Sequence, residues 1–173
     1  MNNIQAMLFD LDGTLLDSTD LIISSFKHVV KKHLDKEISK EELIPNFGRP
    51  LVEAMEEIAP GQGDLLVSLY REYTKIHHDE MVKIFPEVVI TLEKLHELNI
   101  KLGIVTSKVR KTALRGLELF NLDYLFDVFV GYEDTTIHKP KPDPILFALD
   151  KLGVKAKNTL MIGDSPHDLV SAK

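Results

Sequence analysis

Two carboxylates stand at the end of an apolar run near the start of the chain. The run covers residues 4–9, and Asp10 and Asp12 follow it in the segment MLFDLDGTLLD, with Gly13 and Thr14 next. Charges at the end of a buried strand are costly unless a cation, hydrogen bonds or a reaction requires them there. The segment therefore predicts a metal site or a reaction centre.

Further polar groups occur at comparable places along the chain. They are Thr106-Ser107 after LGIV, Lys139 in HKPKPDP, and Asp164 with Asp168 in IGDSPHD. In an open parallel sheet, ligands bind beyond the carboxyl ends of the strands. We therefore expect these groups to converge with the first two carboxylates at one edge of a sheet.

The carboxylates predict a magnesium site. Asp10, Asp12 and Asp164 supply hard oxygen ligands, which suit the near-octahedral coordination of Mg²⁺. The ion would offset the repulsion among the carboxylates and attract a phosphate.

The remaining groups are suited to holding a phosphoryl group. The hydroxyl of Thr106 or Ser107 can donate to a phosphoryl oxygen, and Lys139 adds a cation to a region of accumulated negative charge. Gly13 lets the backbone approach closely, so that N–H groups of the loop face an anion. Phosphoryl transfer needs positioning, charge neutralisation and an in-line nucleophile, and an aspartate carboxylate can accept the phosphoryl group.

The elements that must position these groups alternate along the chain. Short apolar runs at 4–9, 102–105, 128–130 and 159–162 are separated by helical patterns, which is typical of βαβ units and a parallel sheet. Helix starts are predicted at Pro86, at Asp143-Pro144 and at Ser165-Pro166. The helix after Pro86 has apolar positions at Val89, Leu92, Leu95 and Leu98. The pattern predicts an α/β fold with a Rossmann-like, doubly wound parallel sheet.

Residues 17–82 interrupt this alternation with apolar positions at helical spacing. One predicted helical face comprises Ile22, Phe26, Val29, Val30 and His33, and another comprises Leu65, Leu69, Tyr73 and Ile76. We interpret residues 17–82 as a small α-helical cap domain inserted after the first strand of a core domain, which comprises 1–16 and 83–173. The alternative is that these helices are ordinary crossovers packed on the sheet.

Length, composition and charge narrow the function classes. The formal net charge of −6 argues against a general nucleic-acid binder. No window approaches the roughly 18 apolar residues of a membrane span, and the first apolar run lacks the basic flank of a signal peptide. The absence of cysteine excludes disulfide and thiolate chemistry and fits a cytoplasmic location. We expect a monomer or dimer with a small phosphorylated substrate and no nucleic-acid or membrane partner.

The chain ends in GDSPHDLVSAK, one or two turns into a predicted helix. A doubly wound sheet normally continues with at least one more strand. We therefore expect the core domain to be truncated at its carboxyl end.

The four polar groups resemble the four motifs of the haloacid dehalogenase superfamily of phosphohydrolases. The family's DxDGT motif stands at 10–14, its Thr/Ser motif at Thr106, its lysine motif at Lys139 and its GDSxxD motif at 163–168. All four occur in the family's order and span essentially the whole chain. Within the family, the chain is most similar to the phosphoglycolate-phosphatase-like branch, and GYEDTTIHKPKPDP resembles the bacterial inorganic pyrophosphatases of that branch.

The resemblance implies a role for each motif residue. Asp10 would be the nucleophile that forms an aspartyl-phosphate, and Asp12 the general acid and then base, with its backbone carbonyl on Mg²⁺. Thr106 and Lys139 would hold the phosphoryl group. The roles of the fourth motif would be metal binding by Asp164 and support of the metal shell, through water, by Asp168.

Five residues are expected to bind substrate, namely Gly13, Thr14, Arg49, Ser107 and His138. Arg49 lies in the cap turn NFGRPL, where it could meet a distal anion, and a surface arginine is the alternative. His138 is adjacent to Lys139, and Ser107 could instead cap a helix. The basic residues Lys108, Arg110, Lys111 and Arg115 are interpreted as a solvated helix face, and the histidines outside the motif loops as surface residues.

The predicted function is Mg²⁺-dependent hydrolysis of a small phosphate, with inorganic pyrophosphate as the leading candidate. Neither the cap nor the loop 132–138 offers an aromatic platform or an extended polar set for a sugar or nucleoside. The alternatives are phosphoglycolate or another small phosphomonoester as substrate, a sugar-phosphate mutase, and an inactive protein. A receiver-type phospho-switch is disfavoured because receivers carry the phosphorylated aspartate on a later strand.

Overall fold

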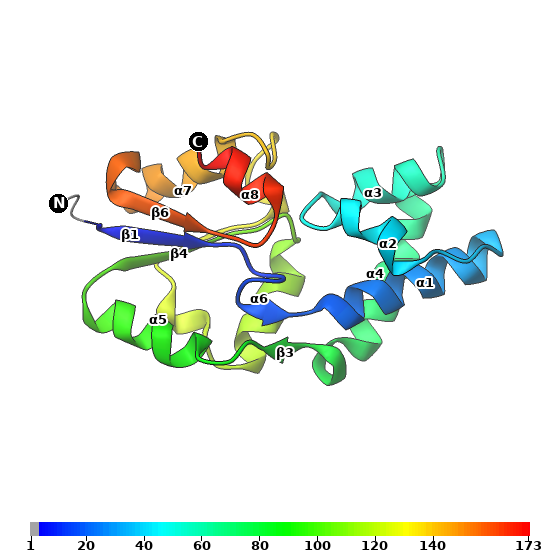
Figure 1. Ribbon diagram of the computed structural model, residues 1–173, viewed down its shortest axis with the longest axis horizontal. Coiled ribbons are helices and arrows are strands. Elements are labelled where there is room, and N and C mark those ends of the chain that lie inside the picture. The colour runs from blue at the N-terminus through cyan, green and yellow to red at the C-terminus, as the bar shows by residue number, and fades with distance from the viewer. Residues whose placement is uncertain (1–3) are drawn as a thin grey trace.

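The computed structural model describes residues 4–173 (Figure 1). Its central sheet is parallel, with the strand order β5-β4-β1-β6. The strands are β1 (Ala6–Phe9), β4 (Lys101–Val105), β5 (Val128–Val130) and β6 (Thr159–Ile162). Helices cover both faces of the sheet, so the predicted α/β fold with a doubly wound parallel sheet is confirmed.

The register brings the carboxyl ends of the strands to one level. Phe9 pairs with Ile104 of β4 and with Ile162 of β6, and Val105 pairs with Val130 of β5. Each of these residues stands at or next to the end of its strand. The residue that follows each strand therefore emerges at the same edge of the sheet.

Successive side chains of β1 point to opposite faces of the sheet, so the core has two layers. Met7 and Phe9 face the cluster beneath α5 and α6, whereas Ala6 and Leu8 face the cluster beneath α7. A side chain at Gly103 of β4 would overlap Leu8, with its Cβ 2.6 Å from the Leu8 Cδ2 atom. This glycine lets the two central strands pack closely.

The helices of the core surround this sheet, and Figure 1 shows α5 and α7 on opposite sides of it. The core helices are α5 (Val88–Glu97), α6 (Arg110–Leu119), α7 (Asp143–Leu152) and α8 (Pro166–Ser171). Short 3-10 helices lie at Ile44–Asn46, Asp123–Leu125, Tyr132–Asp134 and Ala156–Asn158.

Four further helices lie beyond the edge toward which β1 points (Figure 1). They are α1 (Thr19–Leu34), α2 (Lys40–Leu43), α3 (Leu51–Ile58) and α4 (Gly63–Met81). Their apolar side chains form a cluster separate from the two clusters of the sheet, with Val29, Leu43 and Met55 fully buried in it. This separate core is the basis on which we propose residues 17–82 as a cap domain over a core of 1–16 and 83–173.

The two segments that join these helices to the core pair with each other. The strand β2 (Leu16–Asp17) lies antiparallel to β3 (Lys83–Ile84), with Leu16 opposite Ile84. No strand was predicted in these linkers from the sequence, because two residues are too few to show an alternating pattern.

The predicted helix faces were partly wrong. In α4 the buried residues include Leu66, Tyr70 and Thr74, whereas the predicted Leu65 and Ile76 are exposed. In α1 the buried residues Phe26, Val29 and Val30 are as predicted, but His33 is exposed. In α5, Leu92 is buried as predicted and Val89 is exposed, and Leu98, which directly follows the helix, is exposed as well. Because apolar residues occur on more than one side of α4 and α5, periodicity alone did not select the packed face.

Among residues 4–173, no helix combines the length and the apolar character that crossing a bilayer requires.

Candidate active site

Lys139 connects two buried carboxylates at the carboxyl edge of the sheet. Its ammonium donates to the Asp10 Oδ1 atom at 2.9 Å, to the Asp168 Oδ1 atom at 2.6 Å and to the Val105 carbonyl at 3.1 Å. Asp10 comes from the end of β1, and Asp168 from α8. These three bonds use all the hydrogens of the ammonium and fix the position of the lysine. Lys139 does not bind the second oxygen of Asp10, Oδ2.

Burial and the neighbouring charges shift the pKa values of Asp10 and Lys139. Burial raises the pKa of Asp10 to about 6, against the opposing effect of the Lys139 ammonium. For Lys139 itself, burial acts against the charged form, but the Asp10 and Asp168 carboxylates outweigh it and raise its pKa. The lysine therefore stays charged across the physiological range.

Asp164 lies next to this pair. Oxygen atoms of Asp10, Asp164 and Asp168 lie within 4.8 Å of one another. Asp164 accepts a hydrogen bond from the Thr14 hydroxyl at 3.2 Å, and burial raises its pKa. Gly13 has a φ of +86°, and a Cβ there would overlap the Asp164 carboxylate, so this position requires glycine.

Asp12 has a different set of partners. Its Oδ1 atom accepts from the Ser18 hydroxyl at 2.5 Å and from the Lys108 ammonium at 2.7 Å. Neither Ser18 nor Lys108 was predicted as a site residue, and Lys108 had been interpreted as part of a solvated face. The side chain of Lys108 is only 16% exposed. Its contact with Asp12 joins the end of β4 to the loop after β1.

Thr106 and Ser107 follow β4 at the same edge. Thr106 is buried, and its hydroxyl oxygen accepts from the Lys108 backbone N–H at 3.2 Å. Ser107 donates its hydroxyl hydrogen to the Gly48 carbonyl of the cap at 2.9 Å. The serine thus links the core loop to a cap loop in this conformation.

The other two predicted substrate residues have partners elsewhere. The Arg49 guanidinium binds Glu57 at 2.7 Å and the Asn46 side chain at 3.2 Å, both within the cap. His138 stacks on Tyr132 with ring centroids 4.3 Å apart. Neither side chain forms a hydrogen bond with the motif residues, and their substrate contacts remain a prediction.

The donor set of the site fits a divalent cation. Its carboxylates Asp10, Asp12, Asp164 and Asp168 outnumber the ammonium groups of Lys108 and Lys139. Three of the carboxylates offer oxygen atoms close enough together to share one ion. Oxygen-only ligation and excess negative charge suit Mg²⁺ better than a thiophilic metal.

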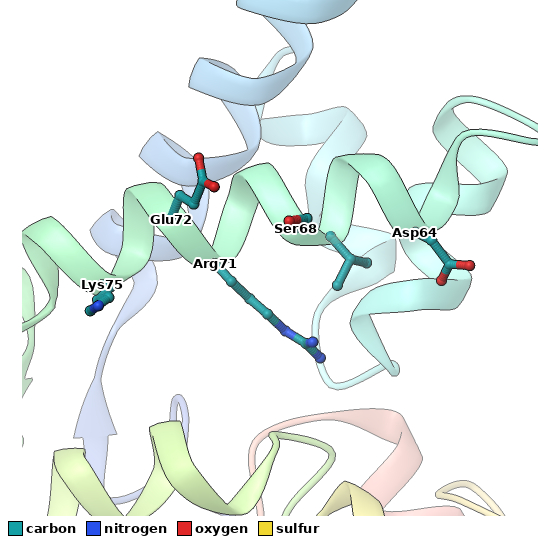
Figure 2. Close-up of a pocket in the computed structure, with 6 residues that line it drawn as sticks. Asp64, Ser68, Arg71, Glu72 and Lys75 are labelled. Carbon is teal, nitrogen blue, oxygen red and sulfur yellow. The ribbon is translucent and has the colours of Figure 1, made fainter.

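A surface depression of about 350 Å³ lies elsewhere, on the cap helix α4. It is lined by Asp64, Val67, Ser68, Arg71, Glu72 and Lys75. Figure 2 shows that these side chains come from one helix, with Arg71 extending away from it. No predicted site residue is among them, so this depression is separate from the motif cluster.

Residues 7–173 match the family model described as haloacid dehalogenase-like hydrolase. A relative from Caldanaerobacter subterraneus is 48% identical over 170 residues, which is 98% of this chain and 77% of the relative. The pyrophosphatase PpaX of Halalkalibacterium halodurans is 40% identical over 98% of this chain and 79% of its own. A predicted phosphoglycolate phosphatase from Haemophilus somnus shares the fold, with a TM-score of 0.87 at 24% identity over 99% of this chain and 82% of its own.

Proposed function

This chain belongs to the haloacid dehalogenase-like hydrolases and is a phosphatase of that family, and we propose that it hydrolyses inorganic pyrophosphate through an aspartyl-phosphate on Asp10. The observation that carries the proposal is the buried contact of Asp10 with Lys139 beside Asp164 and Asp168. The relative that is 40% identical is named a pyrophosphatase, which supports pyrophosphate as the substrate. Phosphoglycolate is the second candidate, because it offers a carboxylate where pyrophosphate offers a phosphate.

The first step is attack by Asp10. Lys139 occupies Oδ1, so Oδ2 is the oxygen available to attack phosphorus. The new Oδ2–P bond forms as the bond from phosphorus to the leaving oxygen breaks. Asp12 donates a proton to that oxygen, and phosphate leaves when pyrophosphate is the substrate.

The second step returns the protein to its starting state. Asp12, now a carboxylate, takes a proton from water as the water oxygen attacks phosphorus. The Oδ2–P bond breaks, and Asp10 is released as a carboxylate together with phosphate. In both steps the Thr106 hydroxyl would donate to a phosphoryl oxygen, and the positive charge of Lys139, held beside Asp10, would stabilise the phosphoryl group. Gly13 and Thr14 would face the phosphoryl oxygens from the β1 loop.

Asp10, Asp164 and the Asp12 backbone carbonyl would hold Mg²⁺, with Asp168 supporting the shell. When bound, the ion supplies charge neutralisation to the carboxylates and the phosphoryl oxygens. The residues by themselves fix the nucleophile through Lys139 and the acid–base group through Ser18 and Lys108. A cytoplasmic location is part of the proposal.

A turnover screen at saturating Mg²⁺ tests the proposal. We expect kcat/KM to be highest for pyrophosphate, lower for phosphoglycolate and much lower for hexose phosphates. Excess chelator should abolish turnover and Mg²⁺ should restore it, whereas Ca²⁺ should inhibit because its larger, looser shell misplaces the nucleophile. A screen led by a hexose phosphate, or full activity in excess chelator, would contradict the proposal.

A further inference from the structure

Lys108 is a mostly buried cation that holds a carboxylate of the proposed reaction centre. Its ammonium donates one hydrogen to the Asp12 Oδ1 atom at 2.7 Å. Within residues 4–173 this is the only hydrogen bond of that ammonium, and a lysine has three hydrogens to donate. Two remain for another acceptor.

The two other cations considered for the substrate, Lys139 and Arg49, are each already paired with two carboxylates. Lys139 donates all three hydrogens to Asp10, Asp168 and the Val105 carbonyl. The Arg49 guanidinium is engaged by Glu57, with Glu53 4.0 Å away. An anion that enters the site beside Asp12 therefore finds Lys108 with donors to spare, and finds Arg49 already neutralised.

The geometry of Asp12 indicates which anion this would be. Ser18 and Lys108 both donate to Oδ1, so Oδ2 is the oxygen left to exchange a proton with the leaving group. A leaving group that takes its proton from Oδ2 of Asp12 lies next to Lys108, because Lys108 is bound to Oδ1 of the same carboxylate. A second negative group on the leaving side would thus come within reach of the Lys108 ammonium.

We propose that Lys108 binds the second anionic group of the substrate and selects compact phosphates that carry one, such as a diphosphate or a carboxymethyl phosphate. The inference rests on the proposed function, because it takes Asp12 as the group that protonates the leaving oxygen. Lys108 thereby takes the contact with the distal anion that was predicted for Arg49.

The test compares substrates with and without the second anion. Lys108→Met should lower kcat/KM for pyrophosphate about 10- to 100-fold more than kcat/KM for 4-nitrophenyl phosphate, which is the range for a lost charged hydrogen bond. Lys108→Arg should recover most of the loss. Lys111→Met removes a charge from the exposed side of α6 and is the matched control. An equal loss for both substrates would reduce Lys108 to a residue that only positions Asp12, and would overturn the inference.

A binding measurement separates this inference from the proposed function. Calorimetry with imidodiphosphate and with inorganic phosphate, both in Mg²⁺, requires no turnover. Lys108→Met should weaken imidodiphosphate about 10-fold or more and leave phosphate within about threefold. If the unaltered protein fails to hydrolyse pyrophosphate, the proposed function is wrong, yet this comparison still decides the role of Lys108. The inference would be refuted if Arg49→Ala, and not Lys108→Met, weakened the binding of imidodiphosphate more than the binding of phosphate.

Discussion

Lys139 contacts carboxylates from the beginning and the end of the chain, and this shapes any mutational test of the site. Removing it would leave Asp10 and Asp168 close together without a cation, and breaking a buried ion pair costs about 3–5 kcal/mol. A Lys139 variant would therefore confound lost stability with lost stabilisation of the phosphoryl charge. Substitutions at the carboxylates are more informative.

Asp10→Asn tests the nucleophile. The amide keeps the size of the side chain and an oxygen that can accept from Lys139, but it cannot form a stable bond to phosphorus. We expect the fold to survive and turnover to fall by several powers of ten, measured as initial rates together with the thermal midpoint. Retention of more than about a tenth of the activity, a barrier change of only about 1.4 kcal/mol, would exclude Asp10 as nucleophile.

Asp12→Ala tests the acid–base group. General acid–base catalysis contributes roughly 10²- to 10⁴-fold. We expect the loss in kcat/KM to be larger for a substrate with a poor leaving group, such as an alkyl phosphate, than for 4-nitrophenyl phosphate, whose leaving group needs little protonation. An equal loss for both would show that Asp12 does not act as the acid.

Some of the site residues could be predicted from sequence and others could not. Asp10, Lys139, Asp164 and Asp168 each follow a strand or a constrained loop, and the parallel topology brings their side chains together, as expected. The contact of Lys108 with Asp12 could not be predicted. A basic residue three positions after a strand is equally compatible with a solvated helix start, and only the path of the loop determines which contact it makes.

At the scale of elements, the end of α4 carries a buried histidine that the sequence analysis had placed on the surface. His78 is fully buried, its Nδ1 atom lies 2.8 Å from Asp79 Oδ1, and its Nε2 atom has no partner within the described residues. Burial, together with the charges of Lys108 and Arg115, lowers its pKa below the ordinary 6.5, although Asp79 opposes the shift. The neutral imidazole is therefore the form that fits the fold.

His78 should make stability depend on pH. Because its pKa is lower in the folded than in the unfolded chain, the unfolded chain takes up the proton first as pH falls below about 7. Stability from this group is thus complete above that pH and declines as pH falls. We expect the urea midpoint to drop between pH 7.5 and 5.5, and to drop less in His78→Leu.

His96→Gln is the control for this measurement, because His96 is exposed on α5. Its midpoint should show the same pH dependence as the unaltered protein. An undiminished drop in His78→Leu would mean that other groups cause the dependence.

Element types were easier to predict than their packed faces. The four strands of the sheet were found because each is a continuous apolar run, as buried parallel strands are. The face of α4 was displaced by one residue, from Leu65 and Leu69 to Leu66 and Tyr70. The helix has apolar residues on both sides, and its packing against α1 and α3 decides which of them are buried.

At the scale of the whole molecule, two of the contacts between the cap and the core bear on a movement of the cap. Ser107 binds the Gly48 carbonyl near the site, and Arg115 of α6 binds the Lys75 carbonyl and Asp79 at the end of α4. The second contact lies near the paired linkers β2 and β3, which would act as the hinge if the cap moves relative to the core. The first contact lies over the site and would change most as the cap moves.

Gly48→Ala should hold the cap away from the core. Gly48 has a φ of +79°, and a Cβ there would lie 2.8 Å from the Ser165 hydroxyl oxygen and 3.0 Å from its Cβ, so the core loop and the cap loop cannot both stay in place. Displacements of about 1 Å at a reaction centre can cost about 100-fold in rate. We expect kcat/KM to fall about 10- to 100-fold, and the radius of gyration from X-ray scattering to rise.

Gly61→Ala separates this effect from backbone strain. Gly61 lies in the same cap with a φ of +78°, but a Cβ there meets no atom within 4 Å. Both alanines cost roughly 1–2 kcal/mol for the left-handed conformation, so the unfolding free energy should fall in both variants. Only Gly48→Ala should lose activity and expand, because only its methyl group pushes against the core. Equal losses of activity in the two variants would show that the packing of Gly48 on Ser165 has no part in closing the site.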